Sequence, residues 1–242
     1  MIDEPPFRTA PLPTVRRMPA YLNLLRRLRA EGCQVVSGTR IAEELGLDSV
    51  QVRKDFSYTG MVGKAGVGFQ IPTVIHMIET FLGWDNTTDA FLIGAGSLGT
   101  AIMGYQGFQR YGLNIVAAFD KNPEKNGLNI HGKQVLPMDK LLDLAQRMHV
   151  QVGIITVPAE GAQEVADQLV EAGVGAIWNF APVSIKVPPT IILQNTELAS
   201  ELAVLSVMLS QAQQKPTPPG LNSPSPSSHP PCSSRDSESG PP

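Results

Sequence analysis

The stretch that decides the fold is Ala90-Phe91-Leu92-Ile93-Gly94-Ala95-Gly96-Ser97-Leu98-Gly99. Its four apolar residues are typical of a buried strand, and they lead into a Gly-x-Gly-x-x-Gly loop that opens a helical pattern. In this context Gly94 permits a tight turn, Gly96 lets a pyrophosphate approach the backbone, and Gly99 allows close packing of helix on strand. The helix N-terminus offers free N–H groups to phosphates. We therefore predict a dinucleotide site formed by Gly94, Ala95, Gly96, Ser97, Leu98 and Gly99.

An acidic residue at the end of the next expected strand narrows the choice of dinucleotide. Asp120 follows the apolar run 115–119 and lies 21 residues after Gly99. A carboxylate at this place accepts hydrogen bonds from the adenine ribose hydroxyls and repels a 2′-phosphate, so it favours NAD(H) over NADP(H). The neighbouring Lys121 leaves slight room for the phosphorylated cofactor.

The chain from residue 84 to residue 195 alternates apolar runs with amphipathic patterns. Such alternation predicts an α/β domain whose parallel sheet is covered by helices on both faces, and right-handed crossovers make the sheet doubly wound. We predict a Rossmann domain over 84–195. The further strands are expected at 115–119, 152–157, 175–178 and 190–193, and the helices at 98–110, 138–147 and 159–172.

Residues 16–83 predict a winged helix-turn-helix domain. A first helix has leucines at helical spacing and ends at Gly32, and Ser37 can cap a short second helix that ends before Gly46. Asp48 stands three residues before Gln51, the spacing of a capping box, so a third helix is expected over 49–58 with Val52 and Phe56 facing inward. The glycine-rich segment 60–69 then predicts a small β-hairpin, or wing, and a last helix is expected over 71–82.

Charge suggests what this first domain binds. Residues 16–64 hold nine basic and five acidic residues, an excess that suits a polyanion. In a helix-turn-helix the third helix enters the major groove, where Gln pairs with adenine and Arg or Lys with guanine. A solvated helix face is the plain alternative for each of these charges. The predicted DNA contacts are Gln51, Arg53, Lys54 and Ser57 of the third helix and Lys64 of the wing.

Enzymatic activity is not expected, and no catalytic residue is assigned. None of the four tyrosines is followed by Lys at the fourth position, and no histidine forms an acid–base pair by spacing. Two alternatives stay open: an NAD-dependent oxidoreductase with a helical extension, and a regulator that binds another nucleotide such as coenzyme A. Cys33 and Cys232 lack metal-ligand spacing, so no metal is expected.

Four further expectations concern the ends of the chain and its location. With no signal peptide and no apolar run long enough to span a membrane, we expect a cytoplasmic protein that has no membrane partner. The Pro-rich residues 1–15 are expected to be flexible. Nine of the 21 prolines fall from Lys215 onward, so the tail 212–242 is expected to be disordered. A helix with an unusually apolar face is expected at 196–211.

The chain resembles the Rex family of bacterial redox-sensing transcriptional repressors over residues 14–210. The resemblance implies a homodimer in which the helix 196–211 swaps onto the partner's Rossmann domain. It also implies binding to an inverted-repeat operator, release of that operator when NADH binds, and competition by NAD+. The matching stretches are Val52–Tyr58, Gly66–Gly68, the loop Gly94–Gly99, Thr156-Val157-Pro158 and Asn179-Phe180-Ala181-Pro182.

The resemblance also implies roles for individual residues. Thr156, Val157 and Pro158 are expected at the cofactor crevice. Tyr105 aligns with a tyrosine that in some members couples the sensor to the opposite DNA-binding domain. Those members pair it with an Arg and an Asp, whereas the aligned positions here hold Asn23 and Glu197, so the contact is expected to differ.

Overall fold

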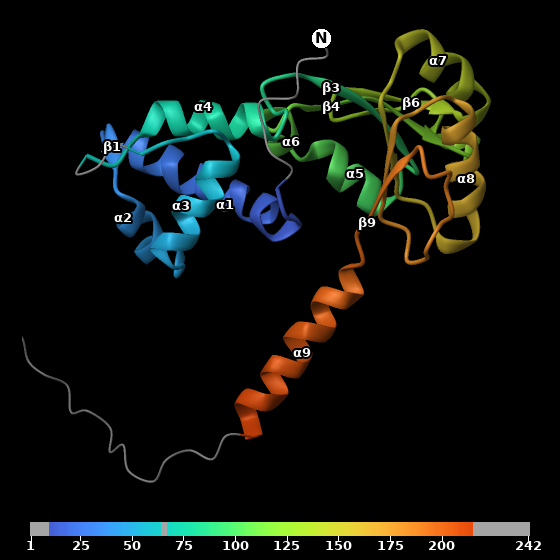
Figure 1. Cartoon of the computed structure of the whole chain (residues 1–242). Coiled ribbons are helices and arrows are strands. Elements are labelled where there is room, and N and C mark those ends of the chain that lie inside the picture. Colours follow the sequence, from blue (N-terminus) through green and yellow to red (C-terminus); the bar gives the residue numbers. More distant parts are fainter. Residues whose placement is uncertain (1–9, 64–66, 215–242) are drawn as a thin grey trace, which may run out of the picture. The chain divides into compact units, whose positions relative to one another are not determined.

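The computed structural model describes residues 10–63 and 67–214, which divide into one compact unit up to Glu197 and a second that begins at Leu198 (Figure 1). Within the first unit, the N-terminal domain consists of short helices and a two-stranded sheet. Its hydrophobic core is built from all four described helices, with Tyr21, Phe56 and Ile78 fully buried. The elements are α1 (Leu12–Ala30), β1 (Val35–Val36), α2 (Gly38–Leu45), α3 (Ser49–Tyr58), β2 (Phe69–Gln70) and α4 (Ile71–Phe81).

The helix-turn-helix has the expected boundaries because its local signals are strong. The Ser37 side chain accepts a hydrogen bond from the Arg40 N–H and caps α2, which ends at Gly46 in the left-handed conformation with φ +63°. Asp48 caps α3 by accepting hydrogen bonds from the N–H groups of Val50 and Gln51. The predicted third helix is confirmed, and Val52 and Phe56 are both fully buried.

The first helix begins earlier than expected. It starts at Leu12, with Pro at its first turn, where the fixed φ of proline suits a helix and its missing N–H leaves no bond unmade. Thr14 is only 3% exposed. The expectation that residues 1–15 are flexible is therefore wrong from Leu12 onward, while residues 1–9 lie outside the described part of the chain.

The glycine-rich segment also differs from the expected wing. In its described part it does not pair with itself: β2 pairs antiparallel with β1, which precedes α2, so that Val36 stands opposite Phe69. The reason is burial, because the Phe69 ring packs edge-on against Phe56 with centroids 5.1 Å apart. Lys64 and Gly66 lie outside the described residues, so the proposed phosphate contact of Lys64 stays a prediction.

The second domain confirms the doubly wound Rossmann prediction. Its sheet has the order β5-β6-β4-β3-β7-β8-β9, and every neighbouring pair is parallel except β5 with β6. Numbered along the chain, the parallel strands run 3-2-1-4-5-6, the order of a dinucleotide-binding sheet. The strands are β3 (Thr88–Ile93), β4 (Leu113–Asp120), β5 (Asn129–Ile130), β6 (Lys133–Pro137), β7 (Val152–Ile155), β8 (Ala176–Asn179) and β9 (Ile192–Asn195).

The side chains of β3 alternate between two hydrophobic layers, one on each face of the sheet. Phe91 and Ile93 pack on one face of the sheet with α7 (Leu141–Met148) and α8 (Ala159–Glu171). Ala90 and Leu92 pack on the other face with α5 (Ser97–Gly104). Residues that alternate along a strand point to opposite faces, so this one apolar run is covered by helices on both sides.

Two parts of this domain differ from what the sequence predicted. The strands β5 and β6 form a hairpin whose turn is His131-Gly132, and both residues have positive φ, as a tight two-residue turn requires. The helix expected over 98–110 is broken into α5 and α6 (Gly107–Arg110) at Tyr105, whose ψ of 98° is not helical. Glycine on both sides of the break lowers helix propensity there.

The second unit is described by its helix α9 (Leu198–Gln214), which begins two residues later and ends three residues later than the helix expected over 196–211. Its large apolar side chains are 55–63% exposed. Among the described residues no helix combines the length and the apolar character needed to cross a membrane. The exposed apolar residues of α9 are Leu198, Leu202, Val204, Leu205, Val207, Met208 and Leu209.

Candidate functional site

The candidate dinucleotide crevice lies between the carboxyl ends of β3 and β7. These two strands are neighbours in the sheet, but the chain leaves them toward opposite edges, to β4 from the first and to β8 from the second. Ligands of open α/β sheets bind at this reversal of strand order. The Thr156 N–H donates to the Ile93 carbonyl across this reversal, and on the other side of β3 the Gly94 N–H donates to the Phe119 carbonyl of β4.

Gly94 and Gly99 have the steric roles that the sequence predicted, and Gly96 is open to solvent. Gly94 has a φ of +104°, and a Cβ there would lie 2.9 Å from the Thr156 backbone. A Cβ at Gly99 would collide with the Gly94 carbonyl oxygen, so only glycine lets α5 come this close to the strand. At Gly96 a Cβ would meet no described heavy atom within 4 Å. Open space therefore lies over Gly96, beside the exposed Ser97 at the start of α5, and its use by a pyrophosphate stays a prediction.

The residues expected at the crevice from the resemblance do gather beside the loop. The Thr156 hydroxyl donates to the loop, with its oxygen 2.7 Å from the Gly94 carbonyl and 3.1 Å from that of Ile93. The Val157 side chain lies against Gly94, and the exposed Pro158 precedes the first turn of α8. Ala95 is buried and Leu98 is half-buried, so these two contribute backbone groups and packing.

Asp120 is 8% exposed and already has hydrogen-bond partners. Its Oδ2 accepts from the Ala95 N–H and from Lys125 Nζ, each at 2.8 Å, and its Oδ1 accepts from the Asn122 N–H at 2.9 Å. Burial acts to raise the pKa of Asp120, but the Lys125 ammonium and the two N–H donors outweigh it and hold the pKa below its usual value. The carboxylate is ionised and clamped to the loop.

Sequence reasoning missed Lys125. It lies in the short 3₁₀ turn Pro123–Lys125 that follows β4, and its ammonium reaches back to the carboxylate five residues earlier. Lys121, the neighbour considered from the sequence, is exposed. The Asn122 side chain caps the 3₁₀ turn by accepting from the Glu124 N–H, and this Asn-Pro turn was the one signal in the sequence that the chain folds back here.

The predicted recognition helix α3 presents three of its four candidate residues to solvent. Arg53, Lys54 and Ser57 are exposed, and Arg53 lies back along its own helix, with its Nε 3.2 Å from the Ser49 carbonyl. Gln51 differs from expectation: it is half-buried, and its Nε2 donates to Asp55 at 2.8 Å instead of standing free.

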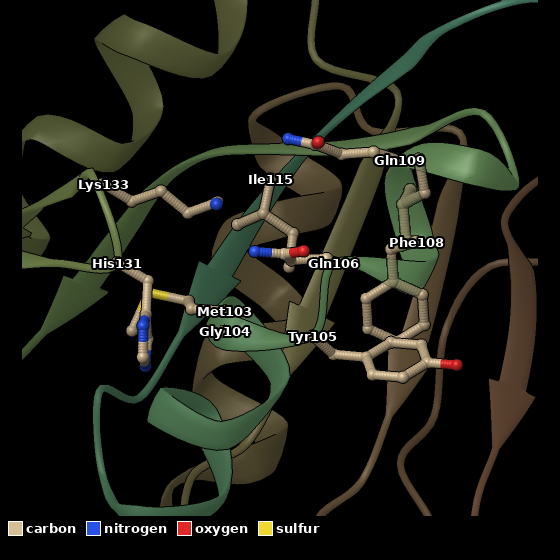
Figure 2. Close-up of a pocket in the computed structure, with 10 residues that line it drawn as sticks. Met103, Gly104, Tyr105, Gln106, Phe108, Gln109, Ile115, His131 and Lys133 are labelled. Atoms are coloured by element: carbon tan, nitrogen blue, oxygen red, sulfur yellow. The ribbon is translucent and has the colours of Figure 1, made fainter.

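Tyr105, the expected coupling residue, lies at the break between α5 and α6 on the rim of a hollow of about 370 Å³. In Figure 2 Gln106 and Lys133 point into this hollow, whereas the Tyr105 hydroxyl points away from it. The Tyr105 ring is 55% exposed and packs edge-on against Phe108. Glu197 ends the first unit, directly before α9. Coupling through Tyr105 and Glu197 stays a prediction.

Two family models match the chain, one in each domain. The model described as "Putative DNA-binding protein N-terminus" matches residues 9–57, and the model described as "CoA binding domain" matches residues 85–183. The first ends within α3, and the second covers the sheet from the start of β3 to just beyond β8.

Curated relatives and solved structures match most of the chain. A redox-sensing transcriptional repressor Rex from Treponema denticola is 48% identical over 81% of this chain and 94% of its own length. Its counterpart from Porphyromonas gingivalis is 42% identical over 81% of this chain and 89% of its own length.

The structure of RSP in complex with β-NAD+ and operator DNA is 33% identical, with a TM-score of 0.81, and covers 85% of this chain and 95% of that one. RSP in complex with β-NADH is 32% identical, with a TM-score of 0.77, and covers 85% of this chain and 97% of that one. The curated relatives are named as repressors and not as enzymes, which agrees with the absence of an expected catalytic pair. With such identity over four fifths of its length, the chain belongs to the Rex family of redox-sensing transcriptional repressors.

Proposed function

We propose that this chain represses transcription as a homodimer on an inverted-repeat operator and leaves the operator when NADH binds its Rossmann domain. The observation that carries the proposal is that one compact unit holds both a helix-turn-helix whose α3 exposes Arg53 and Lys54 and a Rossmann sheet whose glycine loop is open at Gly96. The relative RSP has been solved with β-NAD+ and operator DNA and with β-NADH, so both ligands are known for a protein of the same architecture.

The crevice suits NADH in three respects. The open space at Gly96 admits the pyrophosphate, and the N–H groups at the start of α5 face it. Asp120 lies at the end of β4, where it can accept a hydrogen bond from the adenine ribose. Thr156, Val157 and Pro158 connect β7 to α8 beside the loop, and we assign this side of the site to the nicotinamide half.

The DNA contact is proposed for Arg53, Lys54 and Ser57, with Gln51 at the edge of the face and Lys64 beyond the described residues. Arg and Lys read guanine edges in the major groove, and a dimer places its two helices about 34–36 Å apart on successive turns. Arg53 has to leave its contact with the Ser49 carbonyl to reach a base.

The homodimer is proposed from the exposed apolar face of α9. A monomeric protein rarely exposes so continuous a row of Leu, Val and Met, because such patches mark protein–protein contacts. A swap of α9 onto the Rossmann domain of a second copy covers that face. An apolar hollow of about 390 Å³ in the first unit, lined by Trp84, Phe108, Tyr111 and Trp178, is a candidate surface to receive it.

The test uses a duplex that the wild-type protein selects from a random pool. Fluorescence anisotropy then measures its affinity with no ligand, with NADH, with NAD+ and with coenzyme A. We expect an inverted repeat that NADH releases, that NAD+ does not release, and that coenzyme A leaves unaffected. By linkage, the duplex must weaken NADH binding by the same factor by which NADH weakens duplex binding. Equal NADH affinity with and without the duplex contradicts the proposal.

A further inference from the structure

A buried carboxylate connects the recognition helix to the first helix. Asp55 of α3 is fully buried, yet its two oxygens accept five hydrogen bonds. Oδ2 accepts from Arg17 Nε and from the Tyr21 hydroxyl, each at 2.7 Å. Oδ1 accepts from Arg17 Nη2 and Gln51 Nε2 at 2.8 Å and from the Thr14 hydroxyl at 2.9 Å. Three of the four donor residues, Thr14, Arg17 and Tyr21, belong to the first three turns of α1.

Stability alone does not account for this network. Replacing a buried ion pair by apolar side chains of similar volume is often neutral or stabilising, because the charges no longer have to be taken out of water. Outside this network Thr59 is the one buried polar residue among the described residues of the domain, and Val52 and Phe56 of the same helix are fully buried beside Asp55. What the carboxylate adds is a constraint on the orientation of α3, because hydrogen bonds constrain angles and apolar contacts do not.

The orientation of α3 about its own axis matters because the residues proposed to contact DNA lie on the face opposite to Asp55. Val52, Asp55 and Phe56 point inward at the i, i+3, i+4 spacing, which leaves Lys54 and Ser57 on the opposite face of α3. The tips of side chains lie about 5–6 Å from a helix axis, so a roll of about 20° moves them by roughly 2 Å. A hydrogen bond of 2.7–3.2 Å to a base edge does not survive such a displacement.

We propose that Asp55 is the positioning residue of the recognition helix, and that Thr14, Arg17 and Tyr21 of α1 set the roll of α3 through it. The proposal rests on the proposed function of α3 in operator binding. It also gives the described part of the Pro-rich N-terminus a role, because the early start of α1 is what brings Thr14 and Arg17 to the carboxylate.

The test separates positioning from stability with an apolar variant. The four-site variant Thr14→Val, Arg17→Met, Tyr21→Phe, Asp55→Leu removes the network and leaves no buried charge unpaired. The matched control Arg26→Met, Glu79→Leu removes another ion pair of α1, at 2.7 Å to α4, which does not involve α3. Each is compared with wild type for thermal unfolding, NADH affinity, and affinity for the selected duplex and for the same duplex with one base pair changed in each half-site.

We expect both variants to fold and to bind NADH as the wild type does. The four-site variant is expected to lose at least about tenfold in duplex affinity, the value of one bidentate base contact, and to discriminate less between the two duplexes. The control is expected to keep both properties. A folded four-site variant that binds and discriminates as the wild type does overturns the proposal.

If the four-site variant does not fold, the single variants Thr14→Val and Tyr21→Phe test the positioning role of Asp55. Each removes one hydrogen bond to Asp55 and keeps the ion pair with Arg17. A fewfold loss of duplex affinity and discrimination at unchanged NADH affinity supports the proposal, and wild-type values for both variants overturn it. A wild-type protein that selects no duplex from the pool is a separate result: it contradicts the proposed function, and the positioning role with it.

Discussion

Replacing Gly96 by alanine separates ligand binding from folding at the crevice. Gly96 has φ −82° and ψ −167°, an extended conformation that alanine adopts without strain, and a Cβ there meets no described heavy atom within 4 Å. Alanine also restricts the unfolded chain, which stabilises a compatible site by about 0.4–1 kcal/mol. We therefore expect the melting temperature of the variant to be unchanged or slightly raised.

NADH binding responds in the opposite direction. The added methyl group occupies the open space over the loop and pushes the pyrophosphate away from the N–H groups at the start of α5. Loss of one charge-assisted hydrogen bond costs about 1.5–3 kcal/mol, so NADH affinity is expected to fall by about tenfold to a hundredfold. The operator is expected to stay bound, which makes the variant a repressor that no longer responds to NADH.

Calorimetric titration with NADH and thermal unfolding of the same samples check both expectations. Gly175→Ala is the matched control, because a Cβ there lies 3.6 Å from Gln151, an ordinary contact, and because Gly175 precedes the amino end of β8, away from the carboxyl ends that form the site. Wild-type NADH affinity in the Gly96→Ala protein refutes the placement of the pyrophosphate over this residue. A large loss of stability refutes the open crevice itself.

Four further outcomes follow from the structure. Lys125→Met removes the ammonium partner of Asp120, so competition titrations should show the preference for NADH over NADPH rising by about tenfold. An unchanged ratio of NADH to NADPH affinity contradicts the assignment of Asp120 to the adenine ribose. Arg53→Ala should lower duplex affinity in anisotropy by about 1–3 kcal/mol and leave NADH affinity intact, whereas loss of both means the domains are not separable. Leu205→Asp on the exposed face of α9 should shift the protein from dimer to monomer in analytical ultracentrifugation, and a stable dimer rules out that face. Hydrogen bonds hold the pKa of Asp55 below its ordinary value. Its contribution to the free energy of unfolding is therefore present at neutral pH and is lost as the pH falls from about 4 through the lower pKa of the folded state. The free energy of unfolding of the Asp55→Asn variant should depend less on pH in this range.

The parts of the fold that could be predicted are those fixed by short-range signals. The bounds of α3 follow from the Asp48 cap, and the roles of Gly94 and Gly99 follow from a steric requirement that any Rossmann loop imposes. The bounds of β3 and β7 followed from continuous apolar runs to within two residues, because a strand buried on both faces has to be apolar throughout.

The parts that could not be predicted depend on contacts between distant segments. The strand β6 mixes polar residues with Pro137 and is recognisable only through its pairing with β4. Glycine is required at position 104 because a Cβ there would lie 2.7 Å from His131 of the hairpin, and the break at Tyr105 follows this glycine. Two missed contacts are local instead: Asp55 lies one turn after Gln51 on α3, and Lys125 reaches Asp120 from the 3₁₀ turn that follows β4.

The hydrogen bonds of Thr156 have a consequence for how the sensor transmits its signal. They fasten the dinucleotide loop to the end of the neighbouring strand through contacts within the chain itself, so the shape of the loop at that point does not depend on contacts with a ligand. A ligand shifts an equilibrium between two conformations only by the difference between its affinities for them. A loop that keeps one shape in both conformations contributes equally to both. The free-energy difference that separates repression from release must therefore come from groups that approach the ligand from outside the loop, so variants that change responsiveness without changing recognition should be sought there.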